Sequence, residues 1–159
     1  MRVVVDSNIL FSIIVSGRKS KAFRLLEEHE LTLFAPEEVI LEFRRHSTKL
    51  KKFAKDFEYR TFLTFSLVQI IPLEFYSNKI REAYQIASKF DEKDTPFIAL
   101  AMKLGIPLWT GDKKILSAAI STGRFLALDS TALESLLNGN TLENVINEMK
   151  TRLGILRTQ

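Results

Sequence analysis

Short apolar segments alternate with longer amphipathic segments along nearly the whole chain, and this alternation constrains the fold more than any other feature. The apolar segments are rich in the β-branched and aliphatic residues that strands prefer. We predict strands at 2–6, 31–35, 68–71, 107–110 and 125–128. Elsewhere apolar residues recur at the spacing of a helix packed against a core. Helices are expected at 8–15, 21–29, 36–54, 57–65, 79–90, 96–104, 113–121, 130–137 and 142–152.

This pattern predicts an α/β fold. Strands that are apolar throughout are buried on both faces, which is typical of a doubly wound, five-stranded and mostly parallel sheet with helices on both faces. A chain of 159 residues fits one domain. We assign residues 1–138 to the α/β domain proper and residues 139–159 to a C-terminal helical tail of the same domain, with a loop signal at Asn138, Gly139 and Asn140 between them.

Missing residue types exclude several classes of protein. The chain has no Cys, which removes disulfide scaffolds, thiolate catalysis and Cys-based zinc sites. Its two His are too few for most His-built sites, so any metal would need oxygen ligands. No apolar run approaches the about 20 residues that span a bilayer, and the N-terminus lacks a signal-peptide pattern. We therefore expect a cytoplasmic protein without membrane contact.

Four acidic residues are placed where predicted strands and helices meet. Asp6 directly follows the first strand, and Asp112 follows the fourth. Asp94 precedes the helix that leads into the fourth strand. Glu42 borders the buried face of the helix after the second strand. Because ligands of open parallel sheets bind beyond the carboxyl ends of the strands, we predict that these acids converge on one rim.

Each acid taken alone has a simpler interpretation. Asp is favoured at helix N-caps, so Asp112 can be a cap, and Glu42 can be a solvated surface residue. Clustered carboxylates, however, repel one another and cost stability unless a cation neutralises them. The joint placement therefore favours a divalent metal site. With oxygen ligands alone, Mg²⁺ or Mn²⁺ is the expected ion, and such a site supports metal-assisted hydrolysis at phosphorus.

Four motifs in this chain resemble those of the PIN-domain family of ribonucleases. They are Val-Val-Asp6-Ser-Asn8-Ile-Leu, Pro36 with Glu42 six residues later, Asp94-Thr-Pro-Phe-Ile-Ala-Leu-Ala101, and Trp-Thr110-Gly-Asp112-Lys-Lys. Each motif is short, but the four in this order and at these spacings are specific. The resemblance runs from residue 3 to about residue 128 and does not extend to the tail after Asn138.

The resemblance implies a Rossmann-like sheet and a divalent-metal-dependent endoribonuclease that hydrolyses RNA phosphodiester bonds. By this likeness the catalytic and metal-binding quartet consists of Asp6, Glu42, Asp94 and Asp112. Asn8 and Thr110 would be polar supports, and Asp91 an additional acid near the metal. Whether one or two ions take part is left open.

Basic residues concentrate in one segment just after Glu42. Residues 44–60 contain seven basic and two acidic residues, whereas the whole chain has a net charge of only +4. Such runs are often solvated helix faces, but the position beside the carboxylates favours contacts to RNA phosphates. The predicted RNA-binding residues are Arg44, Arg45, Lys49, Lys51 and Lys52.

Aromatic residues interleave with this basic segment. Aromatics at helical spacing are more often core residues than base-stacking platforms. We therefore expect core positions for Phe53, Phe57, Tyr59, Phe62 and Phe65.

Two other classes of protein share this strand pattern, receiver domains of two-component signalling and phosphatases, but the residues of this chain fit them less well. A receiver domain, by family resemblance, needs an Asp after strand three and a Lys after strand five, but strand three ends at Pro72 and strand five is followed by Asp129. A phosphatase with Asp-x-Asp after strand one would need a carboxylate where Asn8 stands. A non-catalytic RNA- or partner-binding PIN-like scaffold stays open as the alternative.

The resemblance also implies partners. We expect RNA as the substrate, and an antitoxin protein and a second copy of the chain as protein partners. The physiological role is open between a VapC-type toxin controlled by an antitoxin and an RNA-processing enzyme.

Overall fold

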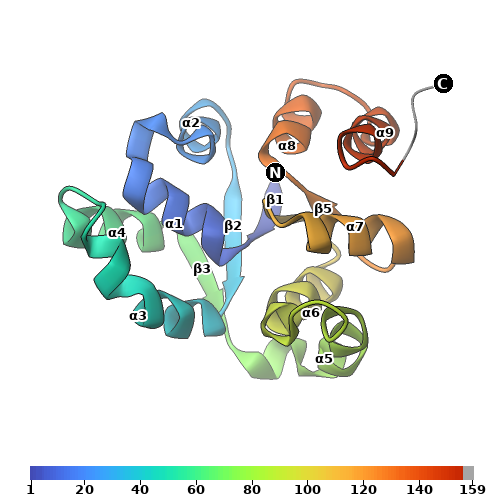
Figure 1. The fold of residues 1–159 in the computed structure, drawn as a ribbon, viewed down its shortest axis with the longest axis horizontal. Helices are drawn as coiled ribbons and strands as arrows, with labels where there is room; N and C mark the ends of the chain where they lie inside the picture. Colours follow the sequence, from blue (N-terminus) through green and yellow to red (C-terminus); the bar gives the residue numbers. More distant parts are fainter. Residues whose placement is uncertain (156–159) are drawn as a thin grey trace.

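The computed structural model describes residues 1–155, and in it five parallel strands form one sheet in the order β3-β2-β1-β4-β5 (Figure 1). Val4 of β1 pairs with Phe34 of β2 on one side and with Leu108 of β4 on the other. The strands are β1 Arg2–Val5, β2 Thr32–Pro36, β3 Val68–Ile71, β4 Leu108–Trp109 and β5 Ala127–Leu128. The predicted doubly wound α/β fold is confirmed, and every strand pair is parallel.

Helices connect the strands and cover the sheet. They are α1 Ser7–Ser16, α2 Lys21–Glu28, α3 Glu38–Lys51, α4 Phe57–Ser66, α5 Leu73–Ala87, α6 Thr95–Leu104, α7 Lys113–Thr122, α8 Ser130–Leu137 and α9 Leu142–Arg152, with short 3-10 turns η1 Gly17–Lys19 and η2 Glu92–Asp94. The crossover from β3 to β4 runs back across the sheet. Because such crossovers are right-handed, α5 and α6 lie on the face opposite α1. Helix α6 contacts β1 and β2, whereas α1 packs against α3 and α4.

The core forms because the central strands are apolar on both faces. Val3, Val4 and Val5 are fully buried, as are both residues of β4. The indole N–H of Trp109 donates to Ser130 Oγ at 3.0 Å, so this large side chain is buried with its polar atom paired.

The connection from β2 to β3 differs from the sequence prediction at Pro36. We expected this proline in the first turn of a helix, but it is the last residue of β2, paired with Ile71, and α3 begins at Glu38. The Glu37 N–H donates to the Ile71 carbonyl at 3.0 Å, so the ladder continues past the proline, and its missing N–H costs nothing at the strand end.

Two helix boundaries also differ. The helix predicted to extend to residue 54 ends at Lys51, and the helix predicted at 79–90 begins six residues earlier, at Leu73. Leu73 and Phe75 are apolar but exposed, which obscured the helical period in the first turn of α5. No helix within residues 1–155 has the length and apolar character that crossing a membrane requires.

The C-terminal helix α9 contributes to the core. It lies against α8 and fully buries Val145 and Met149. The assignment of residues 139–159 to the same domain stays a prediction, and residues 156–159 lie outside the described part of the chain.

We predict that Met149→Ala destabilises the protein by about 2–5 kcal/mol, because it removes a buried side chain and leaves a cavity. Asn147→Ala, an exposed position on the same helix, should change the free energy of unfolding by less than about 0.5 kcal/mol. Urea unfolding of both variants measures this difference. Equal stabilities would mean that α9 is not part of the cooperative domain.

Candidate active site

A chain of hydrogen bonds joins the carboxyl ends of β1 and β4. Asp6 follows β1 and is only 5% exposed, and the fully buried Thr110 donates its hydroxyl proton to Asp6 Oδ2 at 2.6 Å. The same hydroxyl oxygen accepts the Asp112 backbone N–H at 3.0 Å. Because β1 and β4 are parallel neighbours, residues 104 positions apart in the sequence meet at one rim of the sheet.

Asp112 also caps a helix. Its Oδ1 accepts the Lys114 backbone N–H at 2.7 Å and so satisfies an amide in the first turn of α7. The simpler cap interpretation is therefore correct for this side chain. It does not exclude the cluster, because the negative charge of Asp112 also raises the pKa values of Asp6 and Asp94.

Asp94 reaches the rim from the start of α6. It is half-buried, and its Oδ2 is buried without a hydrogen-bond partner among the described residues. Asp91 is exposed three residues earlier, where its Oδ1 accepts the Lys93 N–H at 3.0 Å and caps η2. An unpartnered buried carboxylate oxygen is costly, so Asp94 is the residue of this rim that most needs a ligand.

Glu42 reaches the rim from α3 and is half-buried. Its negative charge raises the pKa values of both Asp6 and Asp94. The structure therefore brings together carboxylates from the four segments that the sequence singled out. Their catalytic and metal-binding roles stay predictions.

Burial and mutual repulsion weaken the acidity of two of these groups. Burial raises the pKa of Asp6 to about 6, with smaller contributions from Glu42 and Asp112, while the Thr110 hydrogen bond opposes the shift. Burial also raises the pKa of Asp94 to about 7, and the charges of Asp6, Asp91, Asp112 and Glu42 add to the effect. Both shifts mean that ionising these two carboxyl groups is costly at this rim.

The carboxylates raise the pKa values of Asp6 and Asp94, but they do not form a coordination shell among the described residues. Within residues 1–155, no three His, Asp or Glu side chains lie close enough to form a ready-made metal site. Asn8 is exposed in the first turn of α1, and no hydrogen bond in the described structure joins it to the acids. The sequence did not single out the neighbouring Ser7 as a site residue. Its hydroxyl is buried next to Asp6, and its Oγ has no hydrogen-bond partner among the described residues. Its only signal in the sequence is its place between Asp6 and Asn8.

The predicted RNA-binding residues lie on α3 and just beyond it, and all of them are exposed. Lys51 Nζ pairs with Glu58 at 2.8 Å, so its charge is partly engaged within the protein.

The expectation that the neighbouring aromatics are core residues is wrong for three of the five. Phe57 is buried and Phe65 half-buried, but Phe53, Tyr59 and Phe62 are 66%, 65% and 71% exposed. They lie on the outer side of α4 and of the preceding turn, where no further layer of the described chain covers them.

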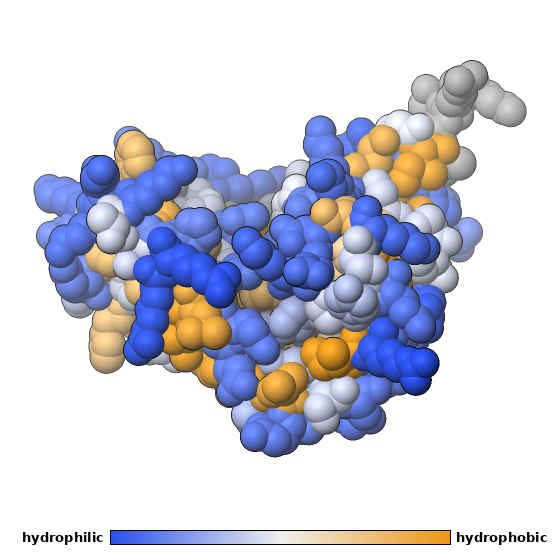
Figure 2. Space-filling model, turned by 60° about the horizontal axis from the view of Figure 1, so that its bottom comes forward, coloured by the Kyte–Doolittle hydropathy of each residue, from blue (hydrophilic) through white to orange (hydrophobic). Residues whose placement is uncertain are grey.

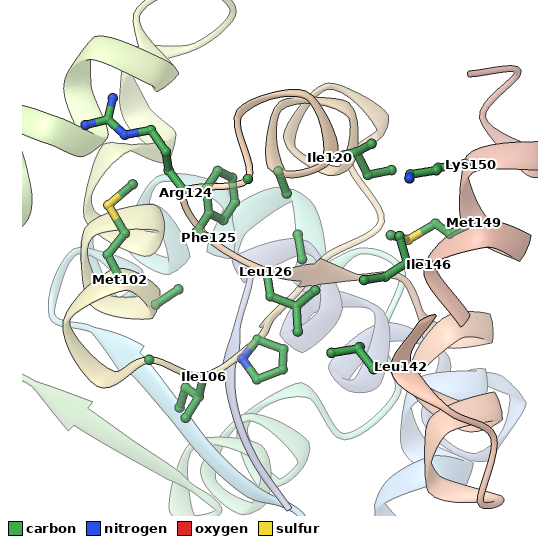
Figure 3. A pocket seen from close by; sticks show the side chains of 16 residues that line it. Met102, Ile106, Ile120, Arg124, Phe125, Leu126, Leu142, Ile146, Met149 and Lys150 are labelled. Carbon is green, nitrogen blue, oxygen red and sulfur yellow. The ribbon is translucent and has the colours of Figure 1, made fainter. Parts of the chain in front are cut away.

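Two cavities of similar size lie in different parts of the molecule. One, of about 460 Å³, is lined by apolar residues of α6, α7, β5 and α9, with Arg124 and Lys150 beside it (Figure 3). It adjoins the residues that enter β4 and β5, such as Pro107 and Leu126, and therefore lies at the edge of the sheet opposite Asp112. The other, of about 470 Å³, is a groove that includes Glu42. Only the groove adjoins the acidic rim.

Fold and site together define a doubly wound α/β domain with an acidic rim at the carboxyl ends of its strands. The PIN-domain profile matches residues 4–151, so the chain belongs to the PIN-domain family. This confirms the resemblance found in the sequence motifs. The expected end of the resemblance near residue 128 is wrong, because the match continues past Asn138 into the C-terminal tail. Members of the family are generally nucleases that use divalent metal ions.

A solved structure shares this fold. It is the crystal structure of VapBC2 from Rickettsia felis bound to a DNA fragment from their promoter. The superposition has a TM-score of 0.63 at 14% sequence identity, and covers 81% of this chain and 98% of that chain. At this identity the likeness shows the fold alone. No match was found among curated proteins.

The raised pKa values predict that the metal-free protein loses stability as the pH rises. Protonated Asp6 and Asp94 contribute stability that is fully present below their ordinary pKa of 3.8 and is lost as the pH passes through about 6 and about 7. Thermal melts in EDTA should therefore give a higher Tm at pH 5 than at pH 7.5.

Asp94→Asn should flatten this pH dependence, because the amide keeps the shape of the side chain and carries no charge. At pH 7.5 without metal, the variant should melt at the same temperature as the wild-type protein or higher. A lower Tm for Asp94→Asn in EDTA would show that the charged carboxylate stabilises the fold and would contradict the repulsion described above.

Proposed function

We propose that the protein is a divalent-metal-dependent endoribonuclease that hydrolyses RNA phosphodiester bonds at the rim formed by Asp6, Glu42, Asp94 and Asp112. The observation that carries this proposal is the buried Oδ2 of Asp94. It has no partner within residues 1–155, and the charges of the three other acids act on its carboxylate. A cation would offset both costs. Membership of a family whose members are generally nucleases supports the same function.

The residues of the rim fit Mg²⁺ or Mn²⁺, which prefer carboxylate oxygens. Asp6, Glu42, Asp94 and Asp112 would hold the ion, with Asp91 as an additional acid. When bound, such an ion acidifies a water molecule for attack on phosphorus and neutralises charge on the phosphoryl oxygens.

Polar neighbours would position these acids for the reaction. The Thr110 hydroxyl fixes the orientation of the Asp6 carboxylate and favours its ionised form, and the Asp112 N–H in turn orients that hydroxyl. Because the pKa of Asp94 is about 7, this carboxyl holds a proton for much of the time near neutral pH in the metal-free protein and must release it to a cation. Asn8, which is exposed in the first turn of α1, would be a further polar support beside these acids.

RNA is the proposed substrate because a run of cations, here called the cationic strip, follows Glu42 along α3 and just beyond it. Arg44 and Arg45 follow Glu42 within one turn of α3, and all the basic residues of the strip are exposed to solvent: Arg44, Arg45, Lys49, Lys51 and Lys52. Contacts from such residues to phosphates are electrostatic and independent of base sequence.

For the physiological role, we propose a VapC-type toxin that an antitoxin protein controls. The shared fold with VapBC2 from Rickettsia felis supports this role over that of an RNA-processing enzyme. A homodimer and a cytoplasmic location stay predictions. The alternative is a non-catalytic PIN-like scaffold, which would bind RNA or a partner without cleaving RNA.

Asp94→Asn should abolish metal-dependent cleavage of single-stranded RNA. Loss of a residue that merely supports a metal ligand costs 10–100-fold, so loss of a ligand charge should lower kcat/KM by at least about 100-fold. Mn²⁺ at a hundredfold excess over its Kd should stabilise the wild-type protein by about 2.7 kcal/mol and the variant much less. Cleavage assays and thermal melts with Mn²⁺ measure the two effects.

Glu28→Gln is the control, because Glu28 is an exposed carboxylate on α2 outside the rim. It should cleave RNA and respond to Mn²⁺ as the wild-type protein does. A wild-type protein that gains stability from Mn²⁺ and binds RNA, but does not cut it, would support the scaffold alternative instead.

Replacing Lys49, Lys51 and Lys52 with Gln should weaken RNA binding across all sequences. It should also flatten the slope of log affinity against log salt by roughly 0.7 for each phosphate that the variant no longer neutralises. Fluorescence anisotropy with labelled RNA at several salt concentrations measures both quantities.

The matched control is the triple replacement of Lys19, Lys89 and Lys103 with Gln, which removes the same charge from exposed positions on other elements. An equal loss of slope in both triple variants would mean that only net charge matters. An unchanged slope in the first variant would mean that the cationic strip is a solvated helix face that does not bind RNA.

A further inference from the structure

A groove opens beside the acidic rim, between α3, α5 and the start of α6. It has a volume of about 470 Å³, within the range of small-ligand pockets. Its apolar lining comes from Leu41, Leu73, Ile80 and Tyr84. Figure 2 brings forward the side of the molecule on which α3, α5 and α6 lie, and shows hydrophobic patches separated by hydrophilic side chains. The groove therefore combines apolar lining with a charged surround.

The groove and the acidic rim share their boundary. Glu42 lines the groove and also acts electrostatically on Asp6 and Asp94. Lys93 and Thr95, the two neighbours of Asp94 in the chain, line the groove as well. A nucleotide whose phosphate lies at the rim would therefore have its neighbour, one nucleotide along the strand, within reach of the groove.

The chemistry of the groove fits a nucleobase better than a phosphate. Its lining contains two cations, Arg45 and Lys93, against three carboxylates, so it has no excess of positive charge for an anion. A nucleobase has flat apolar ring faces and carries hydrogen-bond donors and acceptors at its edge, so it complements a groove that has both apolar and charged side chains. Tyr84 is 48% exposed, so its ring is free to stack on such a ligand.

One side of the groove is held firmly. The fully buried Tyr76 of α5 donates its hydroxyl proton to Glu38 Oε2 at 2.5 Å, which ties α3 to α5 one helical turn before Glu42. The lining contributed by these two helices is thus fixed in advance of binding, which lowers the ordering cost for a ligand.

We propose that this groove binds one base of a single-stranded RNA, next to the phosphodiester bond that is cut, and that Tyr84 stacks on this base. The inference rests on the proposed nuclease function. It assigns the substrate a base contact that the cationic strip does not supply. Because stacking tolerates every base, the groove would favour an unpaired nucleotide rather than a particular sequence.

The test is a coupling experiment between the protein and its substrate. RNA oligonucleotides with one mapped cleavage site would each carry a single abasic nucleotide at a different position near that site. With the wild-type protein and Mn²⁺, one abasic position should lower kcat/KM by about tenfold, as the loss of one stacked base predicts. Tyr84→Ala should lower kcat/KM on intact RNA by a similar factor and show no further loss with that abasic RNA.

Two control variants define the role of the ring. Tyr84→Phe keeps the ring and should retain the difference between intact and abasic RNA. Tyr59→Ala removes a ring from α4 that is 65% exposed and lies outside the groove, and it should leave that difference unchanged. Thermal melts verify that each variant is folded.

Three outcomes would overturn the inference while the nuclease function stands. The first is that no abasic position affects cleavage by the wild-type protein. The second is that the losses in kcat/KM from Tyr84→Ala and from the abasic RNA multiply, which would show that the ring and the base act independently. The third is a stable dimer that Leu41→Lys converts to a monomer, which would assign the groove to a second copy of the chain. Failure of the wild-type protein to cut any RNA with Mn²⁺ would instead overturn the proposed function, and the inference with it.

Discussion

Electrostatic repulsion among carboxylates at one edge of the sheet is the constraint on which the candidate site depends. Parallel pairing sends the carboxyl ends of β1 and β4 to the same rim, and α3 and α6 add acids from either side of it. Burial then removes the water that would screen these charges, which raises the pKa values of Asp6 and Asp94. The apolar core provides the stability that lets the fold tolerate this cost, and a cation would relieve it.

The five strands and most helices could be predicted because local patterns and tertiary packing agree. Val3, Val4 and Val5 form a strand that is buried on both faces, and such a strand is apolar at every position. Prediction failed where a residue fits two structures equally well. Pro36 suits both a helix start and a strand end, and only the partner strand, through Ile71, selects the latter. The exposed Leu73 and Phe75 likewise hid the first turn of α5.

The acids of the site could be predicted from their positions after strands, but their surroundings could not. Nothing in the sequence indicates that the Thr110 hydroxyl serves Asp6 and Asp112 at once, because this contact joins residues that only the β1–β4 pairing brings together. The exposed rings of Phe53, Tyr59 and Phe62 show the same limit. Helical spacing says which residues share a face of α4, but not whether another layer covers that face.

The cap made by Asp112 gives the rim a mechanical link to the rest of the molecule. One carboxylate both contributes charge to the cluster and holds the Lys114 amide that starts α7. Helix α7 in turn packs against the edge strand β5. A ligand that pulled the Asp112 carboxylate toward itself would therefore loosen or reorient the first turn of α7. The amide of Lys114 is thus a natural hydrogen-exchange reporter of occupancy at the rim, readable without any substrate being turned over.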